Sequence, residues 1–121
     1  MNHEISSETL LALLADRFPE ARQDFQQMPE QTSVTAILST LFDVTATLIS
    51  QHKSKAVQQC LRIADELLTH GDAQIRTAVS GLYLYRLSTV LYKKDAQSRF
   101  VFLVLPVGLR SEFARHTYPD E

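Results

Sequence analysis

The chain is 121 residues long, and 45% of its residues are hydrophobic while 21% are charged. These proportions are typical of one globular domain with its own core, and they exclude a mainly disordered chain. A disulfide scaffold is excluded because Cys60 is the only cysteine. The net charge of −2 and the pI of about 6.1 are not those of a typical nucleic-acid-binding domain.

The first predicted helix ends at a proline. Ser6 or Ser7 can cap its N-terminus, and leucines at helical spacing follow. Pro19 is expected to end this helix and to begin a short second helix over residues 19–28, because proline is favoured at the first helical position. The next proline, Pro29, ends that short helix.

The segment over residues 33–50 is the clearest predicted helix, because its large apolar side chains recur every three or four residues. Its opposite face is small and almost uncharged, whereas a solvent-facing helix surface usually carries Glu, Lys and Arg. The residues of this small face are Thr35, Ala36, Ser39, Thr40, Asp43, Ala46, Thr47 and Ser50. The helix is therefore either central in the domain or presents its small face to a partner, with homodimerisation as a variant.

A helical hairpin is predicted around Gly71 and Asp72. Ser54 can cap a helix of about 16 residues, and Gly71 stands where a left-handed C-terminal cap is common. Asp72 can then cap the next helix, which is expected to reach about Lys94 and to be mostly buried, because it is apolar on more than one side. This tight corner makes the two helices antiparallel neighbours.

The apolar run from Phe100 to Leu105 is β-prone, and a run this short does not distinguish a strand from a buried helix. The chain contains no second strand-like run with which it could pair. A helix over residues 98–105 is therefore favoured, with a strand as the alternative. Pro106 ends this segment, and a last helix is predicted over residues 107–116.

The acidic and basic residues are distributed unevenly. Residues 1–52 contain seven acidic and two basic residues, which is a net charge of −5, whereas residues 53–121 contain seven acidic and ten basic residues, which is a net charge of +3. The ten basic residues are dispersed, as they are on ordinary solvated helix faces. The alternative interpretation is a basic surface that binds RNA or DNA.

No motif for catalysis, a cofactor or a metal is present. The four histidines do not pair with one another or with Cys60 at zinc-ligand spacing. The three glycines are far apart, so there is no P-loop and no dinucleotide fingerprint, and neither G-x-S-x-G nor H-E-x-x-H occurs. The sequence therefore predicts a protein that is not an enzyme, with no catalytic, cofactor-binding or metal-binding residues.

Two isolated charges in predicted helices form the candidate site. Asp43 and Arg86 are each the only charged residue in a long stretch of chain. Because a buried charge is costly without a partner, we expect the two to lie close together, as a core ion pair or as part of a polar pocket or partner-binding patch. Tyr83 or Tyr85 is expected to hydrogen-bond nearby, and tyrosine and arginine, including Arg76, are typical interface anchors.

Two resemblances can be stated. The stretch Gly71-Asp72-Ala73-Gln74-Ile75-Arg76-Thr77-Ala78-Val79 resembles the start of the second helix of a HEAT-type repeat, which has an Asp cap followed by an apolar residue, Arg and Ala. The whole chain resembles a family of small bacterial all-α domains of unknown function. The resembling elements are Leu14–Phe18-Pro19, residues 33–50, Leu67-Leu68 with Gly71-Asp72, Ala78-Val79 leading to Leu82–Leu87, and Leu105-Pro106 with Leu109-Arg110. This resemblance implies a compact helical bundle without known enzyme activity, and several such families lie beside polymorphic toxins as immunity proteins.

We therefore predict an all-α fold of five to six helices in one domain over residues 1–121, with antiparallel neighbours, HEAT-like hairpins and short disordered ends at about 1–5 and 117–121. No signal peptide or membrane span is recognised, which predicts a cytoplasmic protein without membrane contact. The expected function is non-catalytic binding of another protein, either to neutralise a toxin or as an adaptor. Nucleic-acid binding through the basic second half is the alternative.

Overall fold

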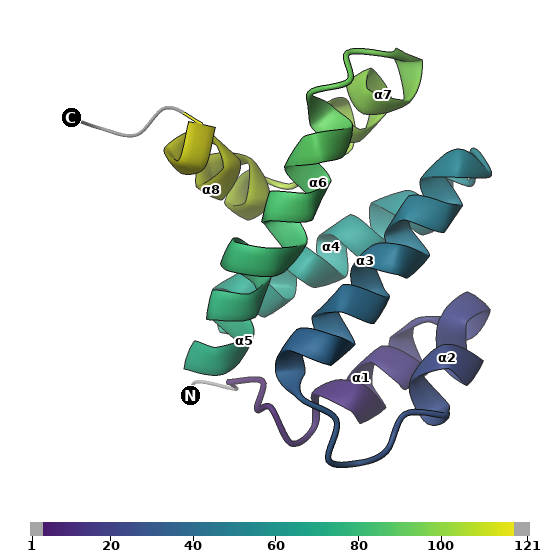
Figure 1. Cartoon of the computed structure of the whole chain (residues 1–121), viewed down its shortest axis with the longest axis vertical. Helices are drawn as coiled ribbons and strands as arrows, with labels where there is room; N and C mark the ends of the chain where they lie inside the picture. Colours follow the sequence, from purple (N-terminus) through teal and green to yellow (C-terminus); the bar gives the residue numbers. More distant parts are fainter. Residues whose placement is uncertain (1–3, 118–121) are drawn as a thin grey trace.

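The computed structural model describes residues 4–117, except for the side chains of Glu20, His116 and Thr117 (Figure 1). The elements in chain order are α1 (Leu10–Arg17), the 3-10 helix η1 (Pro19–Ala21), α2 (Arg22–Gln26), α3 (Val34–Ser50), α4 (Ser54–His70), α5 (Ala73–Ala78), the π-helical segment η2 (Val79–Tyr83), α6 (Leu84–Leu91), α7 (Ala96–Val104) and α8 (Val107–Thr117).

The all-α prediction is confirmed. Because α5, η2 and α6 follow one another without a break, they form one continuous helix. The described part of the chain contains seven helices, where five to six were predicted, and no strand. The apolar run before Pro106 is helical, as favoured over a strand. None of the helices in the described part combines the length and apolar character needed to cross a bilayer.

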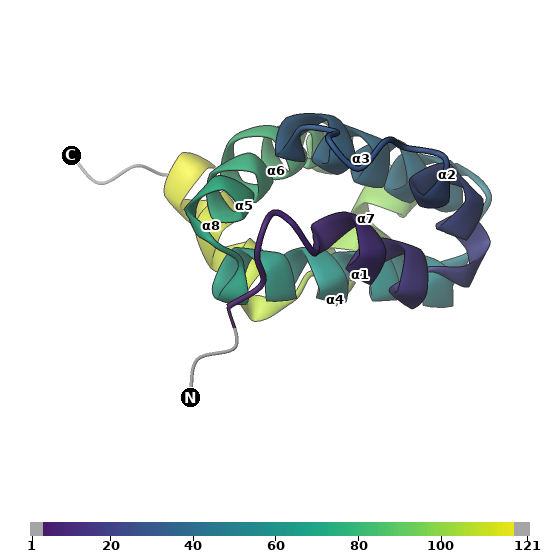
Figure 2. The ribbon, with the colours of Figure 1, turned by 90° about the horizontal axis from the view of Figure 1, so that it is seen from below.

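The helices are arranged in two layers that enclose the core. Figure 2 shows α3 and the continuous α5–α6 helix in one layer, with α1 and α4 in the other. Side chains from both layers are fully buried between them, among them Leu10, Leu14, Leu38, Leu41, Cys60, Leu61, Leu67, Ile75, Tyr83 and Leu87. The two layers bury the apolar stripes that the helical periodicity marks in the sequence.

Side-chain caps define several helix starts. The Asp72 carboxylate accepts a hydrogen bond from the Ile75 amide, as the sequence indicated, and the Ser33 hydroxyl accepts one from the Ala36 amide. Asp95 caps α7 in the same way. The cap expected from Ser54 does not form, because Ser54 is already the first residue of α4 and Lys53 takes the cap position, where it makes no side-chain capping bond.

The prediction of a left-handed Gly71 is wrong, because this residue is extended, with φ −73° and ψ 159°. It is extended because Ile5 pairs alongside it: the Ile5 amide donates to the His70 carbonyl and the Asp72 amide donates to the Ile5 carbonyl, both at 2.8 Å. Glycine is still required here, since a Cβ would collide with the Leu67 carbonyl oxygen. Of the ends expected to be disordered, residues 1–3 and 118–121 lie outside the described residues, whereas Ile5 is held by this pairing.

His52 closes the C-terminus of α3 in the left-handed conformation, with φ 59°. The amides of His52 and Lys53 donate to the carbonyls of Ile49 and Leu48 at 3.0 and 3.1 Å, an arrangement that usually has glycine at this position. Because left-handed backbone costs a non-glycine residue roughly 1 kcal/mol, we expect His52→Gly to raise the free energy of unfolding by about 0.5–1 kcal/mol.

Urea denaturation measures this effect, with Gln51→Gly as the matched control. Gln51 has φ −88°, which any residue adopts, so glycine there relieves no strain and is expected to give no gain. An equal gain in both variants would show that the left-handed backbone of His52 is not the cause.

Candidate functional site

The structure brings the predicted charge pair together at the surface. The Arg86 Nη1 lies 3.9 Å from the Asp43 Oδ1, and it donates a hydrogen bond to the Ser39 hydroxyl at 2.9 Å. The guanidinium also lies 5.0 Å from the centre of the Phe42 ring. The expectation of a core ion pair is wrong, because 68% of the Asp43 side chain and 41% of the Arg86 side chain are exposed. At this exposure, an ion pair contributes at most about 1 kcal/mol.

The other residues of the predicted site are not part of this pair. Tyr83 is fully buried, and its hydroxyl lies 2.9 Å from that of Thr45. Tyr85 is 70% exposed, so the two tyrosines point to different sides of the helix. Arg76 is exposed on α5, ten residues before Arg86, which is about 15 Å along the helix axis. These residues therefore do not form one site.

The small face of α3 is directed outward. Its exposed members are Thr35, Ala36, Asp43, Thr47 and Ser50, and its half-buried members are Ser39, Thr40 and Ala46. The expectation that the helix is central in the domain, with another element close against its small face, is therefore wrong, because α4 and the α5–α6 helix cover the large apolar face. The remaining interpretation, a partner on the small face, stays a prediction.

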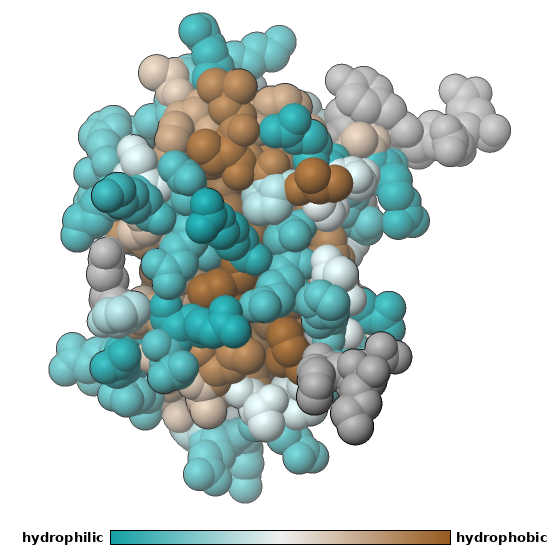
Figure 3. Space-filling model, turned by 180° about the vertical axis from the view of Figure 1, so that it is seen from behind, coloured by the Kyte–Doolittle hydropathy of each residue, from teal (hydrophilic) through white to brown (hydrophobic). Residues whose placement is uncertain are grey.

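Apart from Tyr85, the large apolar side chains that are exposed in the described part of the chain belong to α7, α8 and the residue after α6. They are Tyr92, Phe102, Leu103 and Val107, and with the half-buried Phe113 we name them the α7–α8 patch. Leu103 is 76% exposed and Val107 is 81% exposed, on either side of the Leu105-Pro106 corner. Figure 3 shows apolar side chains collected toward the top of the rear face, at the end of the molecule where α7 lies, with hydrophilic side chains around them.

Aromatic contacts connect the three helices of the patch. The ring centres of Tyr92 and Phe113 are 6.0 Å apart, and those of Phe102 and Phe113 are 6.4 Å apart. Arg110 lies 5.2 Å from the centre of the Phe102 ring, and it donates to the Phe102 carbonyl at 2.9 Å. These contacts join the rings of Tyr92, Phe102 and the half-buried Phe113 across the three helices.

Basic side chains are more frequent than acidic ones near this apolar surface. Lys93, Lys94, Arg99 and Arg110 are all exposed. The acidic residues near it are Asp95, Asp65, which accepts the Leu109 amide, and Glu112, which accepts from Ser80 and Arg115. One oxygen of Asp95 already accepts the Ser98 amide as the cap of α7. The dispersed bases of the second half of the sequence therefore include a local group of like charge at this end of the molecule.

Sequence reasoning did not identify the α7–α8 patch, although a signal for it was present. Successive helical residues point about 100° apart, so a run of six apolar residues encircles the helix. Such a run cannot face only one core, and some of its side chains must point outward or contact a partner. In α7 the inward residues include Val101, and the outward ones are Phe102 and Leu103.

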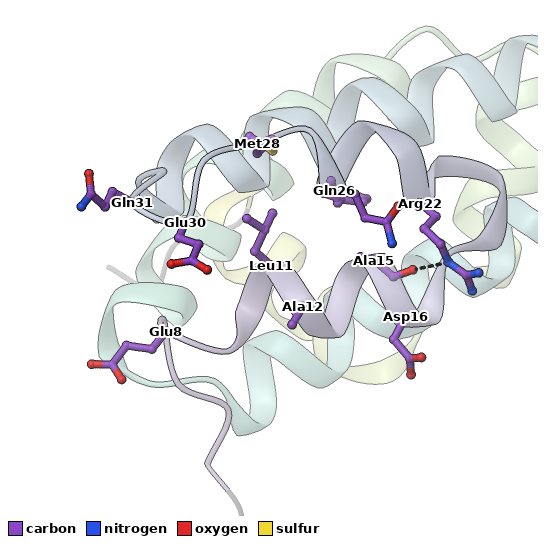
Figure 4. Close-up of a pocket in the computed structure, with 11 residues that line it drawn as sticks. Glu8, Leu11, Ala12, Ala15, Asp16, Arg22, Gln26, Met28, Glu30 and Gln31 are labelled. Carbon is purple, nitrogen blue, oxygen red and sulfur yellow. Dashed lines mark hydrogen bonds between the residues drawn. The ribbon is translucent and has the colours of Figure 1, made fainter.

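A groove between α1 and α2 is lined by more acidic than basic side chains, unlike the surroundings of the α7–α8 patch. Leu11, Ala12, Ala15, Phe25 and Met28 are its apolar lining, and its volume is about 950 Å³. Three carboxylates, Glu8, Asp16 and Glu30, also line it, with Arg22 and two glutamines. Figure 4 shows Glu30, on the loop after α2, pointing toward α1 across the groove, and Leu11 pointing into the space between them. We call this depression the α1–α2 groove.

The shifted pKa values have structural causes. Burial, followed by the nearby Cys60 thiol, raises the pKa of Tyr83 well above its usual value. The Ser7 hydroxyl and the Ile75 amide, which donate hydrogen bonds to the Asp72 carboxylate, lower its pKa. Neither residue lines the groove or the patch. Among the described residues, no three His, Cys, Asp or Glu side chains are grouped as a metal site requires.

Comparison with known proteins identifies a family. The family model described as "Domain of unknown function (DUF7674)" matches residues 11–118. This range includes the whole α7–α8 patch and all of the α1–α2 groove except Glu8. No curated protein and no solved structure matches the chain.

Proposed function

Because the chain belongs to DUF7674, a family of unknown function, its role has to be inferred from its surfaces, and we propose that it is a non-catalytic protein-binding domain that uses the α7–α8 patch. The observation that carries this proposal is the exposure of Leu103 and Val107 on the two helices that also supply the contacting rings of Phe102 and Phe113. Neutralising a toxin and joining two proteins as an adaptor are the two roles that such a surface supports.

The composition of the patch supports a protein partner. Exposed apolar residues are common singly, but a connected group of large ones marks an interaction surface. Tyrosine, phenylalanine and arginine are enriched in protein interfaces, and all three occur here. Full burial of Leu103 or Val107 against a partner contributes roughly 1.5–3 kcal/mol each, and the aromatic contacts reduce the entropy lost on binding.

The non-catalytic part of the proposal rests on the titratable groups. Catalytic residues usually have pKa values shifted within a cleft. Tyr83 and Asp72, whose pKa values are shifted, are a core tyrosine and a helix-capping carboxylate, and neither lies in a cleft. Hydrogen bonds and burial that stabilise the fold account for both shifts, so neither indicates a reaction centre.

We expect the double variant Leu103→Ser/Val107→Ser to lose its protein partner. Replacing both side chains removes enough apolar burial to weaken binding by more than about tenfold. The measurement is capture from native cell lysate with the tagged protein, at low and high salt, with captured proteins quantified by mass spectrometry. The matched control is Tyr85→Ser, which removes an equally exposed apolar residue outside the patch.

At either salt concentration, wild-type protein and Tyr85→Ser are expected to capture more of one protein than the double variant does, because apolar contacts are not screened. A partner that the double variant retains fully would contradict the proposal. Circular dichroism checks that the double variant is folded, which is expected because both side chains are exposed.

Nucleic-acid binding is the second candidate. Tyr92 and Phe102 are exposed next to Lys93, Lys94 and Arg99, and single-stranded nucleic acids bind to such pairings of aromatic and basic side chains. This alternative predicts recovery of nucleic acid at low salt and its loss at high salt, with a log–log slope near one per phosphate contact.

A further inference from the structure

The α7–α8 patch and the α1–α2 groove are complementary in two respects. The patch has protruding apolar side chains, whereas the groove has an apolar lining in a depression. Near the patch, the exposed bases Lys93, Lys94, Arg99 and Arg110 outnumber the carboxylates of Asp95, Asp65 and Glu112, whereas three carboxylates and one guanidinium line the groove. The two surfaces therefore match in apolar character and are opposite in charge.

One molecule cannot bring its own two surfaces together. In Figure 1, α7 lies at the top of the longest axis, and α1 and α2 lie toward the bottom, with α3 and α4 between them. The elements that separate the two surfaces are packed into one core. Contact between a patch and a groove of this sequence therefore requires two copies of the chain.

We propose that copies of this protein associate head to tail, with the α7–α8 patch of one copy seated in the α1–α2 groove of the next. This inference rests on the proposed function and identifies a second copy as the protein that the patch binds. Leu103 and Val107 insert against the apolar lining, while Lys93, Lys94 and Arg99 approach the carboxylates of the groove. Because the two contacting surfaces differ, each added copy leaves one patch and one groove open.

The open ends determine how the assembly behaves. A head-to-tail contact that does not close into a ring adds copies as the protein concentration rises, without a fixed final size. Opposite charges at the two surfaces accelerate and strengthen association at low salt. The assembly is therefore expected to grow with concentration and to shrink with salt, and these two dependences together distinguish it from a closed symmetric dimer.

The first test is sedimentation velocity on the full chain over a wide range of concentration. We compare about 0.05 M with about 0.5 M NaCl, where the Debye length falls from about 14 Å to about 4 Å. The average mass is expected to rise above the 13.7 kDa of one copy at low salt, and the apparent dissociation constant to increase at least tenfold at high salt. Monomer at every concentration in low salt overturns the proposal.

The second test uses two complementary variants. Glu8→Lys/Glu30→Lys reverses the charge of the groove and leaves the patch intact, while Leu103→Ser/Val107→Ser alters the patch and leaves the groove intact. Each variant alone is expected to be a monomer. Their equimolar mixture is expected to form a heterodimer of twice the chain mass and nothing larger, because only one functional patch and one functional groove meet.

The matched control for charge is Asp24→Lys/Asp43→Lys. These carboxylates line a separate depression between α2 and α3, and the change in net charge equals that of the groove variant. The control is expected to assemble like the wild type. If the groove variant and the patch variant each still assemble, and assembly stops at two copies, the contact lies elsewhere, for instance on the small face of α3. That result overturns the proposal.

These outcomes separate the inference from the proposed function. A wild-type chain that stays monomeric, but whose captured partner is lost in Leu103→Ser/Val107→Ser, overturns head-to-tail association and leaves protein binding by the patch standing. A monomeric chain whose captured partner is unaffected by that variant overturns both.

Discussion

Replacing Tyr83 with alanine is expected to lower the free energy of unfolding by about 3–5 kcal/mol. The side chain is fully buried, and its ring packs edge-on against Phe42 with 6.0 Å between ring centres. Truncation to alanine therefore leaves a cavity between α3 and the α5–α6 helix, which the surrounding helices cannot fill completely. Urea denaturation followed by circular dichroism measures the loss.

The hydroxyl of Tyr83 makes a separate and smaller contribution. Thr45 donates its hydroxyl proton to the Leu41 carbonyl at 2.8 Å, so the Tyr83 hydroxyl is the donor in its 2.9 Å bond to Thr45. Tyr83→Phe is expected to cost about 1 kcal/mol, and Thr45→Val about 1–3 kcal/mol, because the valine leaves the buried tyrosine proton unpaired. The double variant is expected to cost less than the sum of the two, since it removes both polar groups.

The same hydroxyl predicts how stability depends on alkaline pH. Burial raises the pKa of Tyr83, so the folded state retains this proton at a pH where the unfolded chain, with a pKa near 10, releases it. Stability is therefore fully present below about pH 10 and falls as the pH rises above it. Tyr83→Phe is expected to flatten this decline, whereas Tyr85→Phe, at an exposed residue, is not. Equal pH profiles in the wild type and Tyr83→Phe would contradict this explanation.

Replacing Asp72 with alanine is expected to lower the free energy of unfolding by about 2–4 kcal/mol. One carboxylate oxygen accepts the amide and the hydroxyl of Ser7, both at 2.7 Å, and the other accepts the Ile75 amide at 2.9 Å. Asp72 therefore caps α5 and also holds the N-terminal segment beside the end of α4. Its replacement removes both roles, and Ser7→Ala is expected to remove only part of the second.

Asp72 also predicts a dependence on acidic pH. The hydrogen bond from the Ser7 hydroxyl, followed by that from the Ile75 amide, lowers the pKa of Asp72 in the folded state. The stability that this carboxylate contributes is present above the unfolded pKa of about 4, and it is lost as the pH falls through the lowered folded value. Asp72→Ala is expected to reduce this acid-dependent loss, and Ser7→Ala to reduce it partly.

Chemical denaturation at neutral and acidic pH measures these differences. The matched control is Asp24→Ala, which removes an exposed carboxylate on α2. An acid dependence that is the same in Asp72→Ala and in the wild type would show that other groups cause the loss. Limited proteolysis near residue 7 provides an independent readout, because the N-terminal segment is expected to be cleaved faster once its anchor is removed.

Local chemistry determined most of the helix boundaries. The prolines at 19 and 106, the capping residues Ser33 and Asp72, and the three-to-four spacing of apolar residues act within a few positions, so they can be read from the chain. The same local information indicated that Asp43 and Arg86 lie near each other, because two isolated charges on central helices favour a shared location.

Other features of the protein depend on contacts between segments that are distant in the chain, so only the tertiary structure determines them. Whether a helix face is covered is determined by its neighbours, so the small face of α3 and the Asp43–Arg86 pair are directed to solvent, although the sequence also fitted a buried position. The conformation of Gly71 depends on Ile5, 66 positions earlier in the chain. The α7–α8 patch and the α1–α2 groove combine residues from several helices. The sequence does not predict them, because the periodicity of one helix determines which residues share a face but not which face another helix covers.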